Sequence, residues 1–522
     1  MVAVCRQGRE MSVRVASVQR VIQRWSRDQV LALAPDAPSK KAAQGVATPG
    51  KWSLRGTTSD VVFGECKGSG AKPYLAAVDL TEPAYRCSCP SRKFPCKHAL
   101  GLLLLWSADE VPEAEAVPPW TAEWLAQRAD RAAKSASRVE AARAEAARTE
   151  AARAEAARTE AGHSAAAENP DGVAGPDGSD SAAGLDRASG VGGVSGAGGG
   201  GLEGVGGAHA VAGLGGRGAE SVRHTRVAAG LAELERWLAD QVRQGLSGAA
   251  ESDWDGLAKR LIDAQAPGVA GIVSRLARVR AGDGWPGRLL EEYALLNLLA
   301  VAYRQRAELP AELAQTVLMR VGFPVTREEV LAGPVTRDRW DVLGSRDEEQ
   351  DRLAARRVWL RGRRTGRAAL ILSFAPPGQA LDASLVTGTT IDADLVFYPG
   401  ASPLRALVAT RHRTPEPSAI QGGGSVVAEG KVPPGVTPEE AMEEIAAVLA
   451  GDPWADSWPI ILADVVPEES ALGGFPLHPR IGDIWRLLAV SGGRPVTVAA
   501  EWTPRGIRPL TTWDEFEAAV IL

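Results

Sequence analysis

The sequence has few of the residues that most readily carry chemistry or cross-links. Its 522 residues include five cysteines and six histidines. So few cysteines, odd in number, are typical of a reducing compartment and exclude a disulfide framework. No apolar run approaches the roughly 20 residues of a membrane span, and no charged segment followed by an apolar stretch and a cleavage site opens the chain. We therefore expect a soluble, cytoplasmic protein with no membrane partner.

Recognisable catalytic motifs are also lacking. The C-terminal half has no nucleophile elbow, zinc-protease motif or dinucleotide loop. The stretch 45–51 has the spacing of a phosphate-binding loop, but Trp52 stands where a magnesium-binding Ser or Thr is required. Asp392 with Asp394 forms a possible carboxylate pair, and His412 is a possible lone base. Such residues usually belong to surfaces or strand edges, so we predict that the protein is not an enzyme. The alternative is an enzyme with an unrecognised active site in the C-terminal region.

The scarce cysteines gather in one place. Cys87, Cys89, Cys96 and His98 lie within twelve residues. Three thiolates and one imidazole make a Cys3His set, one of the combinations that hold a tetrahedral structural zinc ion. Four protein ligands leave no open position for water, so we predict a scaffolding Zn²⁺ rather than a catalytic one. Cys5 and Cys66 stand alone, and we interpret them as ordinary packed or terminal thiols.

The flanking residues predict how these ligands are presented. Residues 84–89 read as a strand, in which Cys87 and Cys89 point to the same face because side chains alternate. Residues 99–106 read as a short buried helix that begins near Cys96. Since residues two apart on a helix diverge by about 200°, Cys96 and His98 must straddle the helix start.

The spacing C-x-C-x6-C-x-H, with a strand before it and an apolar helix after it, resembles the SWIM-type zinc finger. The wider resemblance, through residues 64–70 and 72–74, is to bacterial SWIM proteins and covers roughly the first 110 residues. It implies a small ββα fold that binds DNA or another protein. The resemblance to bacterial SWIM proteins also suggests that the protein is an assembly adaptor for a MoxR-type ATPase system, so an ATPase complex is a possible partner.

Charge supports a binding role for the N-terminal region. Residues 1–106 contain 16 Lys and Arg against 7 Asp and Glu, a net charge of +9 in a chain whose total is −5. Such an asymmetry is expected of a module that meets phosphates or an acidic partner. A basic helix predicted over residues 11–33 adds to this charge, although it could equally pack over the finger.

Composition and periodicity together predict a multidomain α+β protein. We divide it into a zinc-finger domain at 1–111, a Pro-marked linker and charged helix at 112–161, a disordered Gly/Ala-rich tether at 162–219, a helical domain at 220–345 and a mixed, mostly antiparallel α+β domain at 346–522. In the last domain we predict strands at 357–362, 368–374, 390–398, 406–411, 458–465, 485–490, 495–502 and 506–511, and a helix capped by Thr437. Most of the fifteen tryptophans should be core residues.

Overall fold

The computed structural model describes most of the chain outside the N-terminus and the Gly-rich segment. The described residues are 24–134, 211–248, 251–280, 284–350, 353–412 and 432–522, apart from positions 69, 71, 92, 377, 378, 380 and 483, with isolated helical positions between 137 and 148. They divide into two compact units, one drawn from 1–143, 307–319 and 324–522, and the other from 144–306 and 320–323. The multidomain α+β class is confirmed by their mixture of helices and antiparallel sheets.

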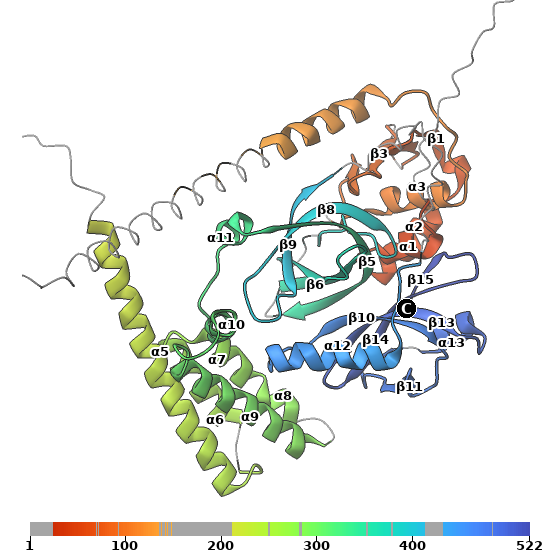
Figure 1. Cartoon of the computed structure of the whole chain (residues 1–522). Helices are drawn as coiled ribbons and strands as arrows, with labels where there is room; N and C mark the ends of the chain where they lie inside the picture. The colour runs from red at the N-terminus through yellow and green to blue at the C-terminus, as the bar shows by residue number, and fades with distance from the viewer. Residues whose placement is uncertain are drawn as a thin grey trace, which may run out of the picture. The chain divides into compact units, whose positions relative to one another are not determined.

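The N-terminal part of the first unit is a four-stranded antiparallel sheet with helices packed on it (Figure 1). Its elements are α1 (Arg27–Ala32), α2 (Ala37–Val46), the 3-10 turn η1 (Pro49–Lys51), β1 (Trp52–Thr57), β2 (Val61–Cys66), β3 (Tyr74–Asp79), β4 (Ala84–Cys87) and α3 (Lys97–Ser107). A further helix spans 119–134. The strand predicted at 84–89 corresponds to β4, which ends at Cys87, and the helix predicted at 99–106 is confirmed as α3. The sheet is larger than that of a ββα unit alone.

Helix α3 is the centre of this domain. Residues 98–106 are all buried because the sheet covers one side of the helix while α1 and α2 cover another. Gly101 lets α2 approach closely, since a Cβ at that position would lie 2.5 Å from Val46 Cγ2. Of the helix predicted over residues 11–33, the part from residue 24 onward is described, and there α1 begins at a capping box of Ser26 and Gln29.

A closed five-stranded barrel follows in the first unit. Its strands are β5 (Val335–Gln350), β6 (Leu353–Gly362), β7 (Ala368–Ala375), β8 (Thr390–Phe397) and β9 (Arg405–Arg411), arranged β5-β6-β7-β9-β8, and α11 (Arg327–Ala332) precedes them. The ladder between β7 and β9 is parallel and the other barrel ladders are antiparallel. Trp340, Val358 and Leu395 fill the interior. Because β5 begins at Val335, strand structure starts inside the range for which a helical domain is predicted.

A second antiparallel sheet packs on the outside of the barrel. It is formed by β10 (Trp458–Val465), β13 (Val496–Thr503), β14 (Gly506–Trp513) and β15 (Ala519–Ile521), beside α12 (Pro438–Gly451), the β11 (Ala471–Leu472) and β12 (Phe475–Pro476) hairpin, and α13 (Trp485–Ser491). The predicted capping of α12 by Thr437 is confirmed. The strand predicted at 485–490 is wrong, because these residues form α13, which buries Leu487 and ends at Gly492 with φ +55°.

The second unit is helical. It contains α5 (Val211–Gln244), α6 (Glu251–Asp263), α7 (Pro267–Ser274), α8 (Leu276–Arg280), α9 (Trp285–Arg304) and the last two residues of α10 (Ala311–Val321), whose other residues belong to the first unit. Leu234, Leu257 and Leu261 are buried in its core, where Trp254 Nε1 donates to the Tyr293 hydroxyl at 3.1 Å. Helix α5 begins at Val211, within the range predicted to be a tether. Most of the predicted charged helix and tether lies outside the described residues. No helix in the described ranges has both the length and the hydropathy needed to cross a membrane.

Candidate metal centre

The hairpin of β3 and β4 presents the first two cysteines. Cys87 is the last residue of β4, paired with Ala76 of β3. The ladder extends beyond the strand, because the Ser88 backbone N–H donates to Leu75 O at 3.0 Å and the Leu75 N–H donates to Ser88 Oγ at 2.9 Å. This anchored turn holds Cys89 next to Cys87 across the end of the sheet.

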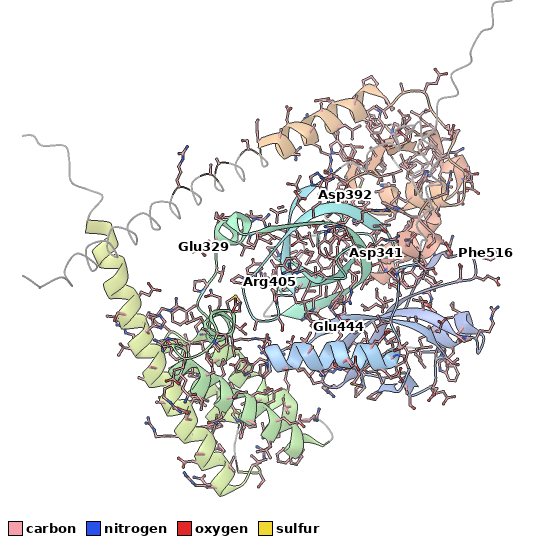
Figure 2. All side chains as sticks on the ribbon, in the orientation of Figure 1. Glu329, Asp341, Asp392, Arg405, Glu444 and Phe516 are labelled. Carbon is pink, nitrogen blue, oxygen red and sulfur yellow. The ribbon has the colours of Figure 1, made fainter. Side chains whose placement is uncertain are left out.

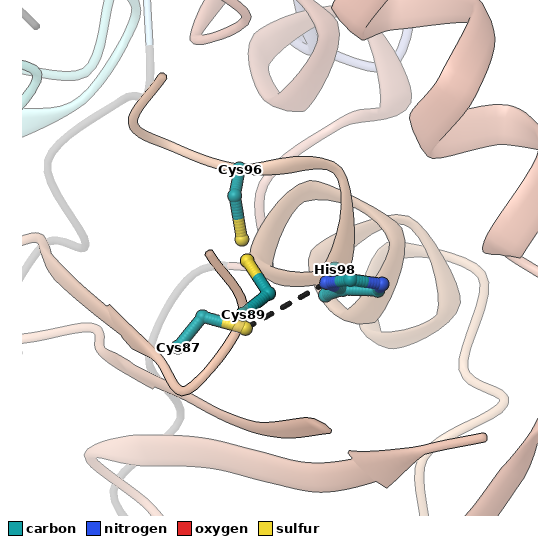
Figure 3. A group of neighbouring side chains, drawn as sticks. All are labelled: Cys87, Cys89, Cys96 and His98. Atoms are coloured by element: carbon teal, nitrogen blue, oxygen red, sulfur yellow. Dashed lines mark hydrogen bonds between the residues drawn. The ribbon is translucent and has the colours of Figure 1, made fainter. Parts of the chain in front are cut away.

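The start of α3 presents the other two residues. Cys96 is the N-cap, with an extended backbone of φ −76° and ψ 166°, and His98 lies in the first helical turn. The prediction that these two residues straddle the helix start is confirmed. The extended backbone at Cys96 brings its sulfur and the His98 ring to the same side of the helix end (Figure 3).

The four side chains converge closely enough to share one ion. Their candidate ligand atoms all lie within 4.8 Å of one another, and Cys87 Sγ lies 3.7 Å from His98 Nδ1. Neighbouring ligands of a tetrahedral zinc ion, at normal Zn–S and Zn–N lengths, are about 3.6–3.8 Å apart. The cluster is therefore compatible with a Cys3His zinc site, and among the described residues it is the group of metal-binding side chains that the structure brings together.

Electrostatics explain why these thiols favour a cation. The pKa of Cys96 is lowered to about 4, chiefly by hydrogen bonding to Cys87 and further by His98 and the Ala99 backbone. The pKa of Cys87 is raised, because its thiol donates to the Cys96 thiolate and is buried, and burial also raises the pKa of Cys89. A first thiolate thus makes the next two deprotonations costly. A divalent cation among the sulfurs removes this repulsion, as metal–thiolate chemistry requires.

The surroundings close the site. Cys96 is 1% exposed and His98 is 4% exposed. The His98 ring stacks on Tyr74 with the ring centroids 4.7 Å apart. The sequence did not predict this contact, although the two-residue alternation of β3 indicates which strand face Tyr74 occupies. With four protein ligands and little solvent access, the arrangement suits a structural ion, which stabilises the hairpin against the helix.

Cys5, Cys66 and His224 lie outside this cluster. Cys66 is buried in β2, where burial raises the pKa of its thiol, and its Sγ donates to Lys67 O at 3.8 Å. Cys5 lies outside the described residues. His224 Nδ1 lies 2.7 Å from the Tyr303 hydroxyl in the helical unit. The stretch 45–51 resembling a phosphate loop divides between the end of α2 and the turn η1. Trp52, which follows it, begins β1, and its Nε1 donates to Val46 O at 2.9 Å.

The possible catalytic residues form two separate polar pairs on the barrel. Asp392, which is labelled in Figure 2, accepts from Arg337 Nε at 3.2 Å and from its Nη2 at 3.1 Å. His412 Nε2 lies 2.9 Å from Asp394 Oδ1. None of Asp392, Asp394 and His412 is among the residues that line the large cavity described below. The absence of catalytic activity stays a prediction.

Comparison with known proteins identifies two segments. Residues 78–106 match the family model of the SWIM zinc finger, and residues 222–321 match that of the SWIM-associated four-helix bundle domain. The first match contains all four candidate ligands, and the second coincides with the helices α5 to α10. No curated protein and no solved structure gives a significant match.

Proposed function

We propose that this chain, a SWIM-type zinc finger protein, binds nucleic acid through lysines beside its zinc site. In this proposal the ion has a structural role, and the finger surface supplies the contacts. A zinc-binding role follows from the family match together with the convergence of Cys87, Cys89, Cys96 and His98. The proposed partner depends on the charges around that site.

The observation that carries the proposal is a group of four exposed lysines, Lys51, Lys67, Lys72 and Lys97, which we call the lysine cluster. Lys51 and Lys97 both act electrostatically on the Cys66 thiol. The Lys67 backbone N–H donates to Lys51 O at 2.8 Å, and Lys72 lies in the loop that joins β2 to β3. These lysines therefore gather at one end of the sheet.

The lysine cluster lacks neutralising acids. Within the described residues, no carboxylate forms an ion pair with any of its members, whereas Lys93 of the same domain pairs with Asp36. Lys97 is also the first residue of α3, where the positive end of the helix dipole adds to its charge. Unpaired cations beside a helix N-terminus are a suitable surface for backbone phosphates.

The barrel is a weaker candidate for the same role. Five-stranded barrels of the OB type bind oligonucleotides on the face of their second and third strands. Here that outer face is occupied, because Trp359 of β6 and Leu370 of β7 pack against Ile461 and Trp513 of the C-terminal sheet. We therefore assign the contact with nucleic acid to the finger. The described cysteines of the finger form no disulfide bond, which agrees with a reducing, cytoplasmic location.

The salt dependence of binding tests this proposal. Neutralising four duplex phosphates gives a slope of log affinity against log salt of about −3.6, so affinity for a fluorescent DNA duplex should fall about 100-fold between 50 and 200 mM salt. Replacing the four lysines of the cluster by glutamine should remove most of this slope. Lys93→Gln is the matched control, because Lys93 is already paired, and it should leave the slope unchanged.

Zinc content must be measured for each variant, since Lys97 adjoins two ligands. If the variants keep their zinc and bind DNA as the wild type does, or if the wild type binds with no salt dependence, the nucleic-acid proposal is wrong. The remaining prediction would then be a protein partner, such as the ATPase complex suggested by the family resemblance.

A further inference from the structure

A large, partly open cavity lies in the first unit, and the zinc finger contributes part of its lining. Its volume is about 660 Å³, within the range of small-molecule sites. Tyr85 and Phe94 of the finger, Arg128 of helix 119–134, and Ala383, Val408 and Arg411 of the barrel region are among the residues that line it. Three segments that are distant in sequence thus line the cavity, and Tyr85 and Phe94 each lie two residues before a candidate zinc ligand.

Arg411 is an unpaired cation in this cavity. Its Nη1 donates to Ser384 O at 3.1 Å and its Nη2 donates to Ser384 Oγ at 2.8 Å, both neutral acceptors. No carboxylate within the described residues forms an ion pair with Arg411; Asp382 and Glu82 also line the cavity and act on its charge from beyond ion-pair distance. Burial lowers the pKa of the guanidinium, which nevertheless stays charged at neutral pH.

The second arginine of the cavity shows the contrast. Arg128 lies 3.4 Å from Asp79 Oδ2 and 3.5 Å from Glu82 Oε2, so its charge is balanced by the finger's own acids. A desolvated guanidinium without a carboxylate partner is costly, and an incoming anion would offset that cost. The position of Arg411 therefore favours a ligand with a negative group.

The rest of the lining defines the body of that ligand. Phe94, Pro95, Leu381, Val408 and several alanines give apolar walls, and the Tyr85 hydroxyl is already engaged by Ala383 O at 3.2 Å. From these observations we propose that the cavity binds a small organic anion, with an aromatic or aliphatic body against the apolar walls and a carboxylate or phosphate on Arg411. This ligand site goes beyond the proposed function and is independent of it.

Two fluorescent probes of nearly the same shape test the proposal. The anionic 1-anilinonaphthalene-8-sulfonate carries the required negative group, and N-phenyl-1-naphthylamine lacks it. The full-length protein should bind the anionic probe at one saturable site, about 10-fold or more tightly than the neutral probe, because a charged hydrogen bond contributes that much. Arg411→Met should abolish this preference. Arg405→Met is the matched control, because Arg405 is exposed at the start of the same strand (Figure 2) and should leave the preference intact.

A further variant keeps the test decisive if Arg411→Met fails to fold. Arg411→Lys retains the charge but loses the planar fork, and it should bind the anionic probe with intermediate affinity. Equal affinities for both probes in the wild type, or a preference that is as large in Arg411→Met or Arg411→Lys as in the wild type, would overturn the proposal. Displacement of the anionic probe by benzoate or by phenyl phosphate then distinguishes a carboxylate ligand from a phosphate ligand.

Discussion

Removal of the zinc ion should unfold the finger, and Cys96→Ser should have the same effect. Structural zinc in small fingers contributes about 10–16 kcal/mol of apparent binding free energy at neutral pH, as much as the whole stability of a typical domain, about 5–15 kcal/mol. Cys96 is the most demanding position to replace, since it is 1% exposed and also the N-cap of α3. Its substitution removes a ligand and leaves a hydroxyl buried among sulfurs.

Metal analysis and hydrogen exchange together measure this effect. The wild-type chain should contain one zinc per molecule, and a strong chelator should abolish amide protection across β3, β4 and α3 while β13 and β14 of the C-terminal sheet stay protected. Cys66→Ala provides the matched control, because Cys66 is equally buried in the same domain but lies outside the cluster. It should keep the zinc and cost only about 1 kcal/mol.

Two outcomes would refute this reasoning. One is a wild-type protein, purified without chelators, that contains no zinc. The other is a Cys96→Ser variant that has lost the ion but protects the amides of α3 as well as the wild type does. In the second case the apolar packing of α3, rather than the ion, would be the main source of stability.

Three further predictions concern the surrounding fold, each measurable by denaturant unfolding. Gly101→Ala should destabilise the finger by about 1–3 kcal/mol because its Cβ would clash with Val46. Gly45→Ala, in open space within α2, should be neutral or stabilising. Equal changes in the free energy of unfolding for the two variants would contradict this. Glu501→Ala should cost about 3–5 kcal/mol, since this carboxylate is 1% exposed and accepts from two arginines, and a loss below about 1 kcal/mol would show that the pair is dispensable. Burial and neighbouring arginines lower the pKa of His478 to about 4. Below the ordinary histidine pKa of 6.5, unfolding therefore takes up a proton, and the free energy of unfolding should fall by up to about 3 kcal/mol between pH 6.5 and 4. A His478→Gln variant with the same pH profile as the wild type would argue against this origin.

Local patterns in the sequence predicted much of the fold. Capping residues and proline predicted α12, the strands predicted at 357–362, 368–374, 390–398 and 406–411 correspond to β6 to β9, and the ligand spacing predicted the start of α3. The error at 485–490 has a physical cause: a short apolar run suits either a strand or a helix, and its fate depends on what it packs against. Here Leu487 is buried while Trp485 is 64% exposed, the pattern of a short surface helix.

The first strand of the barrel, β5, was not predicted from the sequence, for a different reason. Strand β5 carries Asp338 and Asp341, both 5% exposed, where a strand core is normally apolar. Asp338 accepts from the backbone N–H of Arg364 and Thr365, and Asp341 accepts from Arg363 and Thr390. These partners lie far along the chain, so no local pattern shows that the two charges can be buried.

The sequence by itself determined the metal-binding chemistry, because thiolates and an imidazole at fixed spacing on a hairpin and a helix start depend on neighbours within twelve residues. The tertiary structure alone decided the closure of the barrel, since β7 and β9 pair in parallel with β8 between them in sequence. It also decided which cations are balanced. Lys93 forms an ion pair with Asp36, whereas Arg411, at the cavity, donates hydrogen bonds to the neutral Ser384. Ion pairing depends on distances in space, which the order of residues does not specify.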